Sequence, residues 1–239
     1  MDAASQLQLR FPRLLAAQRP WVLHLQGVYA HSVSDFGAAA ARFAEAEQLC
    51  ASAPHEASLR SLCCAQRALS LLCGGAPGCA GAAADALSAA SAAPLVPCFA
   101  AQAATMFSSA LFAIRRESPT EAKALLSRCL KAGHAELNNH ELVGSALTAL
   151  GAVVLQQGDC VQAKDMLMSS FTLGKAAGDL QAQAVSLSLL AGVHGQSGSV
   201  REAKEMETYS ARKLGQRRKA LEAALETDSH RLACGMPAE

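Results

Sequence analysis

The sequence predicts an all-α fold, a solenoid of about five helix pairs that ends in a capping helix. Three observations carry this prediction. The chain of 239 residues is 51% hydrophobic but only 4% aromatic, and alanine dominates its apolar residues, which favours close-packed helices over sheets. Apolar residues recur at helical spacing, and a turn followed by a helix start recurs about every 40 residues. The net charge of +1 gives no global field that would attract nucleic acid or an acidic membrane.

The first two pairs are indicated by their turns. Ser34-Asp35 starts a second helix that carries Ala39 and Phe43, and the glycine-rich segment 74–78 lies about midway to the next helix start. The N-terminus lacks a cationic segment followed by a compact apolar run, so we expect no signal peptide.

Three later helix starts share one pattern, an N-cap residue followed three positions on by Glu or Gln. This capping-box form occurs at Ser118–Glu121, Asp159–Gln162 and Ser199–Glu202, which lie 41 and 40 residues apart. An alanine follows each start, at Ala122, Ala163 and Ala203. We therefore expect one repeat domain over 1–229, with a disordered tail over 230–239.

The apolar passage 92–114 is the longest in the chain. It contains Pro94, Pro97 and several polar residues, so a buried helix is favoured over a membrane span. The cysteines are odd in number and show no metal-ligand spacing, which indicates reduced residues of an intracellular protein. They are Cys50, Cys63, Cys64, Cys73, Cys79, Cys98, Cys129, Cys160 and Cys234.

No motif in the sequence is a strong indication of a catalytic or cofactor site. The segment 192–198 is glycine-rich, but it follows a helical pattern and not a strand, so we interpret it as a turn. His140-Glu141 is better explained as a polar helix start after Asn138-Asn139 than as an acid–base pair. The sequence therefore predicts no catalytic, metal or cofactor site, and no enzyme.

A basic stretch lies on the last long helix, and it admits two interpretations. It could contact nucleic acid or act as a nuclear signal, but glutamates flank it and Tyr209 is the one aromatic nearby. A solvated capping helix is favoured, and no direct contact with nucleic acid is expected. The stretch consists of Arg212, Lys213, Arg217, Arg218 and Lys219.

Within each pair the pattern resembles the tetratricopeptide repeat. The matching positions in the fourth pair are Leu147, Leu150, Gly151, Gly158, Ala163 and Leu167. The period exceeds the usual 34 residues by about six, so helices or turns should be longer than standard. The resemblance implies a right-handed solenoid in which Gly151 lies at a helix contact. It also implies an inner wall, formed by the first helices, that binds a peptide. The wall positions are His24, His31, Thr148, Gln156, Ser188 and Gln196.

The order of motifs is similar to that of the MAU-type chromatid cohesion factors, the tetratricopeptide subunits of the cohesin loader. The resemblance rests on 121–123, 135–138 and Leu147-x-x-Leu150-Gly151 with Gly158, and on the segments 21–50 and 198–221. It corresponds to the C-terminal part of that longer family.

This resemblance implies a non-enzymatic, chromatin-associated protein of the nucleus, without membrane contact. It would enclose the extended N-terminal segment of a Nipped-B/adherin-type subunit, and so support cohesin loading and sister-chromatid cohesion. A generic tetratricopeptide adaptor with an unrelated peptide partner is the main alternative, and an enzyme is a distant third.

Overall fold

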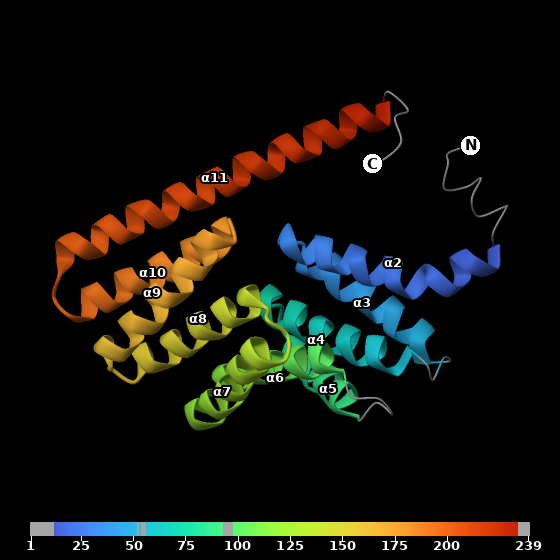
Figure 1. The fold of residues 1–239 in the computed structure, drawn as a ribbon, viewed down its shortest axis with the longest axis horizontal. Helices are drawn as coiled ribbons and strands as arrows, with labels where there is room; N and C mark the ends of the chain where they lie inside the picture. Colours follow the sequence, from blue (N-terminus) through green and yellow to red (C-terminus); the bar gives the residue numbers. More distant parts are fainter. Residues whose placement is uncertain (1–11, 52, 54–55, 93–97, 234–239) are drawn as a thin grey trace. The chain divides into compact units, whose positions relative to one another are not determined.

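The computed structural model describes residues 12–51, 53, 56–92 and 98–233, and these form ten α-helices (Figure 1). The first five are α2 (Pro12–Ser32), α3 (Phe36–Ala51), α4 (Ala57–Gly74), α5 (Cys79–Ser91) and α6 (Phe99–Arg115). The others are α7 (Pro119–Ala135), α8 (His140–Gln156), α9 (Cys160–Ala176), α10 (Leu180–Gln196) and α11 (Val200–Ala233). The all-α class and the five helix pairs predicted from the sequence are confirmed.

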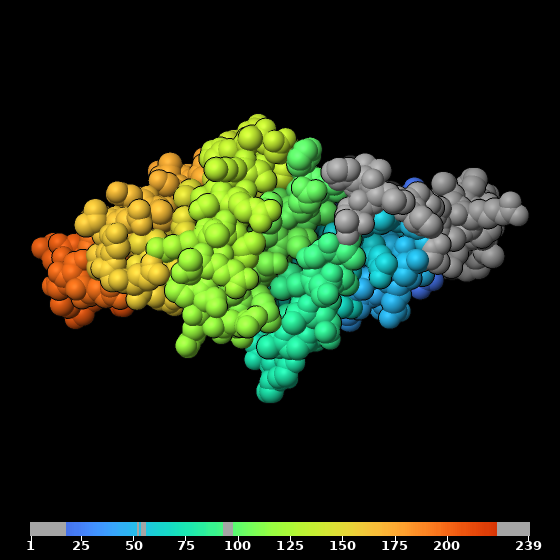
Figure 2. Space-filling model, turned by 90° about the horizontal axis from the view of Figure 1, so that it is seen from below, coloured from blue at the N-terminus to red at the C-terminus, as the bar shows by residue number. Residues whose placement is uncertain are grey.

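The chain divides into two compact units, residues 1–125 and 126–239, with the boundary inside α7. In the first unit, α3 packs on α2 and α4, and α4 also packs on α5 and α6. In the second, α9 packs on α8 and α10, and α10 packs on α11. The surface of the second unit accordingly follows the order of the chain, from yellow-green to orange (Figure 2).

Such sequential packing of helix pairs defines a tetratricopeptide-like solenoid. The domain limits 1–229 and 230–239 stay a prediction: α11 reaches Ala233, and residues 234–239 lie outside the described residues.

The long repeat period comes from long helices. The helices α6 to α10 have 17 residues each, and three residues separate α8 from α9, α9 from α10 and α10 from α11. Two such helices alone take up the 34 residues of a standard repeat. The helices, not the turns, therefore account for the period near 40.

The helix starts lie where the sequence predicts them. The helices α7, α9 and α11 begin one residue after Ser118, Asp159 and Ser199. Asp159 Oδ1 accepts a hydrogen bond from Gln162 N at 3.0 Å, and Asn139 Oδ1 accepts one from Leu142 N at 3.0 Å. Each cap satisfies an amide that has no partner within its helix. His140 is thus a helix start, as predicted.

The turns close in one repeated way. Before α3, α7, α9, α10 and α11, the N–H of the residue that precedes the helix donates to the carbonyl five residues earlier, for example from Ser118 to Ala113 at 2.9 Å and from Ser199 to His194 at 2.8 Å. The residue before each start has a positive φ: 56° at Glu117, 84° at Gly158 and 77° at Gly198. This is the geometry of a Schellman-type helix end, so the 192–198 segment is a helix end and a turn, as predicted.

Two helix glycines allow close contact between the helices of a pair. A Cβ added at Gly151 would lie 2.8 Å from Leu167 Cγ, and one added at Gly27 would lie 2.6 Å from Phe43 Cε1. In both pairs the contacting side chain follows its glycine by 16 positions. The predicted packing role of Gly151 is confirmed, and Gly27 has the same role in the first pair.

Buried serines link neighbouring helices as well. Ser108 Oγ donates to the Ala65 carbonyl at 2.9 Å in the first unit, and Ser210 Oγ donates to the Ala184 carbonyl at 2.8 Å in the second. These hydroxyls can enter an alanine-rich core because each has a partner there. Small side chains therefore supply both the close packing and the polar links between helices.

Residues 99–114 of the long apolar passage lie in α6, which packs on α4 and α5 with one face buried, and residues 93–97 of the passage lie outside the described residues. Over the part of the chain that the structure describes, none of the helices combines the length and hydropathy needed to cross a membrane.

Candidate functional site

The two predicted wall histidines lie on α2 in the first unit, and both are engaged with other side chains. His24 is buried, its Nδ1 lies 3.6 Å from Cys63 Sγ, and its ring contacts the Phe43 ring with centroids 5.8 Å apart. His31 Nδ1 lies 2.9 Å from Ser70 Oγ. Burial lowers the pKa of both imidazoles below the usual 6.5, which favours their neutral form.

Thr148 belongs to a hydroxyl cluster in the second unit. Its Oγ1 lies 2.5 Å from Ser170 Oγ on α9 and 3.5 Å from Ser186 Oγ on α10. Ser170 Oγ in turn donates to the Gly144 carbonyl at 2.8 Å. Thr148 therefore joins α8, α9 and α10, and its hydroxyl is occupied by that network.

The other three predicted wall residues are exposed. Gln156 lies at the end of α8, and Ser188 and Gln196 lie on α10. Gln196 Oε1 accepts a weak hydrogen bond from Cys160 Sγ at 3.5 Å. In the second unit, then, Gln156, Ser188 and Gln196 are available to a partner, and Thr148 is largely committed to packing. Their role in binding stays a prediction.

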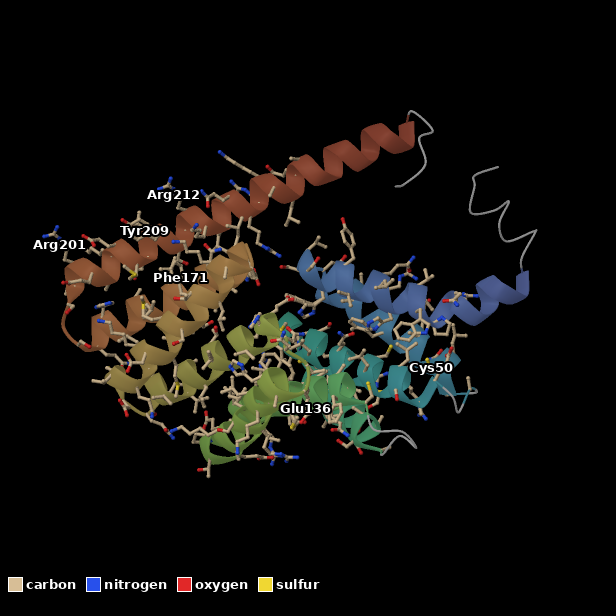
Figure 3. The ribbon with its side chains drawn as sticks, viewed as in Figure 1. Cys50, Glu136, Phe171, Arg201, Tyr209 and Arg212 are labelled. Atoms are coloured by element: carbon tan, nitrogen blue, oxygen red, sulfur yellow. The ribbon has the colours of Figure 1, made fainter. Side chains whose placement is uncertain are left out.

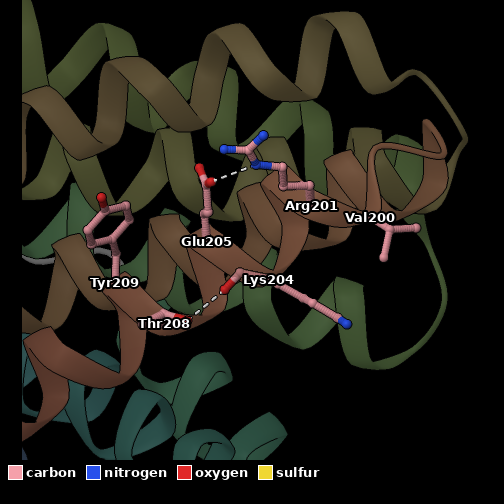
Figure 4. Close-up of a pocket in the computed structure, with 6 residues that line it drawn as sticks. All are labelled: Val200, Arg201, Lys204, Glu205, Thr208 and Tyr209. Carbon is pink, nitrogen blue, oxygen red and sulfur yellow. Dashed lines mark hydrogen bonds and ion pairs between the residues drawn. The ribbon is translucent and has the colours of Figure 1, made fainter.

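Sequence reasoning missed two hollows in the second unit. The first, of about 620 Å³, follows one face of α11, where the Arg201 guanidinium pairs with Glu205 at 3.3 Å (Figure 4). Figure 3 shows Arg201, Tyr209 and Arg212 pointing from α11 away from α10. The second, of about 600 Å³, lies where the ends of α9, α10 and α11 meet and is lined by Lys164, Asp165, His194 and Glu202, among others. Both linings mix acidic and basic groups, so neither selects a ligand by charge.

The basic stretch lies along α11 as predicted, and Arg212, Arg218 and Lys219 are exposed. Arg218 pairs with Glu222 at 3.8 Å across one helical turn. Exposed pairs of this kind stabilise a helix by only a few tenths of a kcal/mol, roughly 0.3–0.5 kcal/mol. This fits the interpretation of a solvated helix.

None of the cysteines that the structure describes takes part in a disulfide, and four of them are buried: Cys50, Cys63, Cys64 and Cys129. Burial raises the pKa of Cys50 and of Cys64 to about 12 and that of Cys129 to about 11. The thiolate is the nucleophile and the metal ligand, so these protonated groups are unreactive. Over the same residues, no three His, Cys, Asp or Glu side chains are placed to share a metal ion.

No protein-family model matches the chain. It is, however, 31% identical over 205 residues to the sister chromatid cohesion protein SCC4 of Arabidopsis thaliana. The aligned region covers 85% of this chain. The chain is homologous to part of SCC4.

The chain spans 27% of the length of that curated relative. The resemblance to a chromatid cohesion factor, inferred from the order of the motifs, is thus confirmed, and it covers a part of a longer protein as expected. Two of the residues on which the resemblance rests have structural roles in the solenoid, since Gly151 lies at a helix contact and Gly158 in a turn.

Proposed function

We propose that the chain is a non-enzymatic scaffold part of the cohesin loader, which acts on chromatin in the nucleus. It binds the extended N-terminal segment of a Nipped-B/adherin-type subunit and so supports cohesin loading and sister-chromatid cohesion. The observation that carries this proposal is the 31% identity to a sister chromatid cohesion protein over 85% of the chain.

The exposed polar side chains of the first helices support a binding role. The first helices α8 and α10 present the exposed polar residues Gln156, Ser188 and Gln196, and repeated first helices form extended binding surfaces in solenoids. An extended partner that orders along its whole length makes many individually weak contacts. A single small polar side chain therefore contributes little, whereas bulk placed on the same surface obstructs the partner.

The test is co-purification of the chain with the N-terminal segment of a Nipped-B-type subunit. Gln156→Ala should leave binding almost unchanged. The double variant Gln156→Trp with Ser188→Trp should abolish it, because both positions are exposed and neither takes part in the hydroxyl cluster around Thr148.

Met168→Trp is the matched control, because Met168 is 46% exposed but lies on α9, a second helix. It should bind like the unmodified chain. If the unmodified chain does not bind the segment, the proposal is wrong, and the generic adaptor with an unrelated peptide partner becomes the better explanation.

A further inference from the structure

Among the residues that the structure describes, α2 carries more exposed large apolar side chains than any other helix. Trp21 is 47% exposed, Leu25 63% and Tyr29 53%, and Val22 and Val28 are exposed as well. Trp21, Leu25 and Val28 follow one stripe at helical spacing, and Val22, Leu25 and Tyr29 follow a second that shares Leu25. Together they form one continuous surface, which we name the α2 face. Contiguous exposed apolar patches often mark interaction sites.

Residues on the opposite side of α2 pack against neighbouring helices and hold the α2 face in place. Leu23 packs into a cluster with Ala46, Cys50, Leu59 and Cys63, and Gly27 rests against the Phe43 ring. This packing fixes the rotation of α2, so the apolar residues on its other side stay outward.

Trp21 is further braced by the His24 ring, with centroids 6.0 Å apart and planes at 83°. A rigid, half-exposed tryptophan is the kind of residue that dominates binding energy at interfaces.

The corresponding helix of the last pair shows what such a surface does within this fold. The second helices α3 and α11 begin 164 positions apart, so Val22 and Tyr29 correspond to Ser186 and Val193 on α10. Both of these are buried, Ser186 beside Ser170 of α9 and Val193 in a cluster with residues of α8 and α9. These two positions of a first helix are covered by other helices of the chain, whereas Val185 and Gly192, which correspond to Trp21 and Val28, are exposed.

The charge of α2 indicates the kind of helix that would cover it. The segment 12–32 contains two arginines and no Asp or Glu, and Arg19 is exposed next to the apolar residues. We propose that the α2 face binds an amphipathic helix of a partner protein that has an apolar stripe flanked by carboxylates. Apolar residues at i, i+3, i+4 and i+7 of that helix lie along Trp21, Leu25 and Val28, and its acidic flank faces Arg19. The inference rests on α2 alone and not on the proposed role in cohesin loading.

The chain contains a single tryptophan, Trp21, so its fluorescence reports on the α2 face directly. The probe is a tryptophan-free peptide of about 18 residues, or five helical turns, with leucines at helical spacing and glutamates on its other faces. Its addition to the full chain should shift the emission to shorter wavelength and protect Trp21 from acrylamide. A scrambled peptide of the same composition should do neither, and a lysine version should bind several-fold more weakly.

Leu25→Glu should weaken binding of the acidic peptide about tenfold or more, because it places a charge in the centre of the apolar face. Leu25 is largely exposed, so helicity by circular dichroism should be unchanged. Val161→Glu on α9 is the control, since Val161 is 76% exposed and lies in the other unit, and binding should be unaffected.

Three results would overturn the proposal. One is the absence of any shift with the acidic peptide, and another is an equal shift with the scrambled one. The third is a shift on raising the concentration of the chain without peptide, which would show that a second copy covers the α2 face.

Discussion

The two units build the same local structure from different residues, and the difference is largest on their first helices. Trp21, His24 and Val28 on α2 correspond to Val185, Ser188 and Gly192 on α10. The first set is large and partly aromatic, whereas the second is small and offers little side chain to a partner. A repeat thus fixes the positions of the helices and leaves the chemistry of each surface free to differ.

The turns differ between the units in a similar way. In turns of the same geometry, the left-handed residue is Ser34 or Glu117 in the first unit and Gly158, Gly178 or Gly198 in the second. Gly75 and Gly78 in the first unit and Asn138 in the second are left-handed as well. A side chain in this conformation costs about 1 kcal/mol that glycine does not. The turns at Ser34 and Glu117 therefore carry backbone strain that the turns at Gly158, Gly178 and Gly198 avoid.

The contact glycines are what the two units share, and changing them should have the largest effect. Gly151→Leu should lower the free energy of unfolding by about 1–3 kcal/mol, because the new side chain would overlap Leu167. Gly27→Leu should cost at least as much, since the Phe43 ring is rigid and buried. Urea denaturation measures both.

Gly195→Leu is the control for this pair, because no atom lies within 4 Å of a Cβ at that helical position. Its stability should be unchanged or higher by up to about 1 kcal/mol, since leucine is the better helix former. A Gly151→Leu protein as stable as the unmodified chain would show that the helix contact does not constrain this position.

The turn residues should respond with opposite signs in the two units. Gly158→Ala should lower stability by about 0.5–1 kcal/mol, because its φ of 84° strains any side chain. Glu117→Gly should raise stability by up to about 1 kcal/mol by removing the same strain. Thermal melting of both variants tests this, and a loss of stability in Glu117→Gly would contradict it.

The smallest effect should be a pH dependence that originates in the first unit. Burial lowers the pKa of His24 and His31 below 6.5. Between this lowered pKa in the folded chain and the pKa of 6.5 in the unfolded chain, the unfolded chain therefore binds protons that the folded chain does not. These two histidines therefore leave the free energy of unfolding unchanged above pH 6.5 and lower it as the pH drops below 6.5. The melting temperature should be lower at pH 5.5 than at pH 7.5 by a few degrees, roughly as expected for a domain of this size.

His24→Leu should reduce that decrease, because it removes one of the two groups. An equal decrease in the variant would mean that other groups cause it.

At high pH the buried thiols should lower stability. The pKa values of Cys50 and Cys64 are raised to about 12 each, which predicts a loss of stability above pH 9, where the unfolded thiols ionise.

The helix starts at 119, 160 and 200 were predictable because each depends on a capping residue and its neighbours in the chain. The environment of Thr148 was not predictable in this way. Thr148 and Ser188 occupy the same register 40 residues apart, yet one is bound to Ser170 and the other is exposed. The difference arises from residues on α9 and α10 that no local pattern connects to Thr148.

The sequence by itself determined the local plan of this protein: ten helices, their turns, the period near 40 and the glycines that let paired helices approach. These features follow from capping, backbone freedom and helical periodicity, which act over a few residues. Only the tertiary structure decided that His24 is buried while Trp21, on the same helix, is half exposed. That choice depends on how α3 and α4 fix the rotation of α2, and hence on contacts between residues distant in the chain.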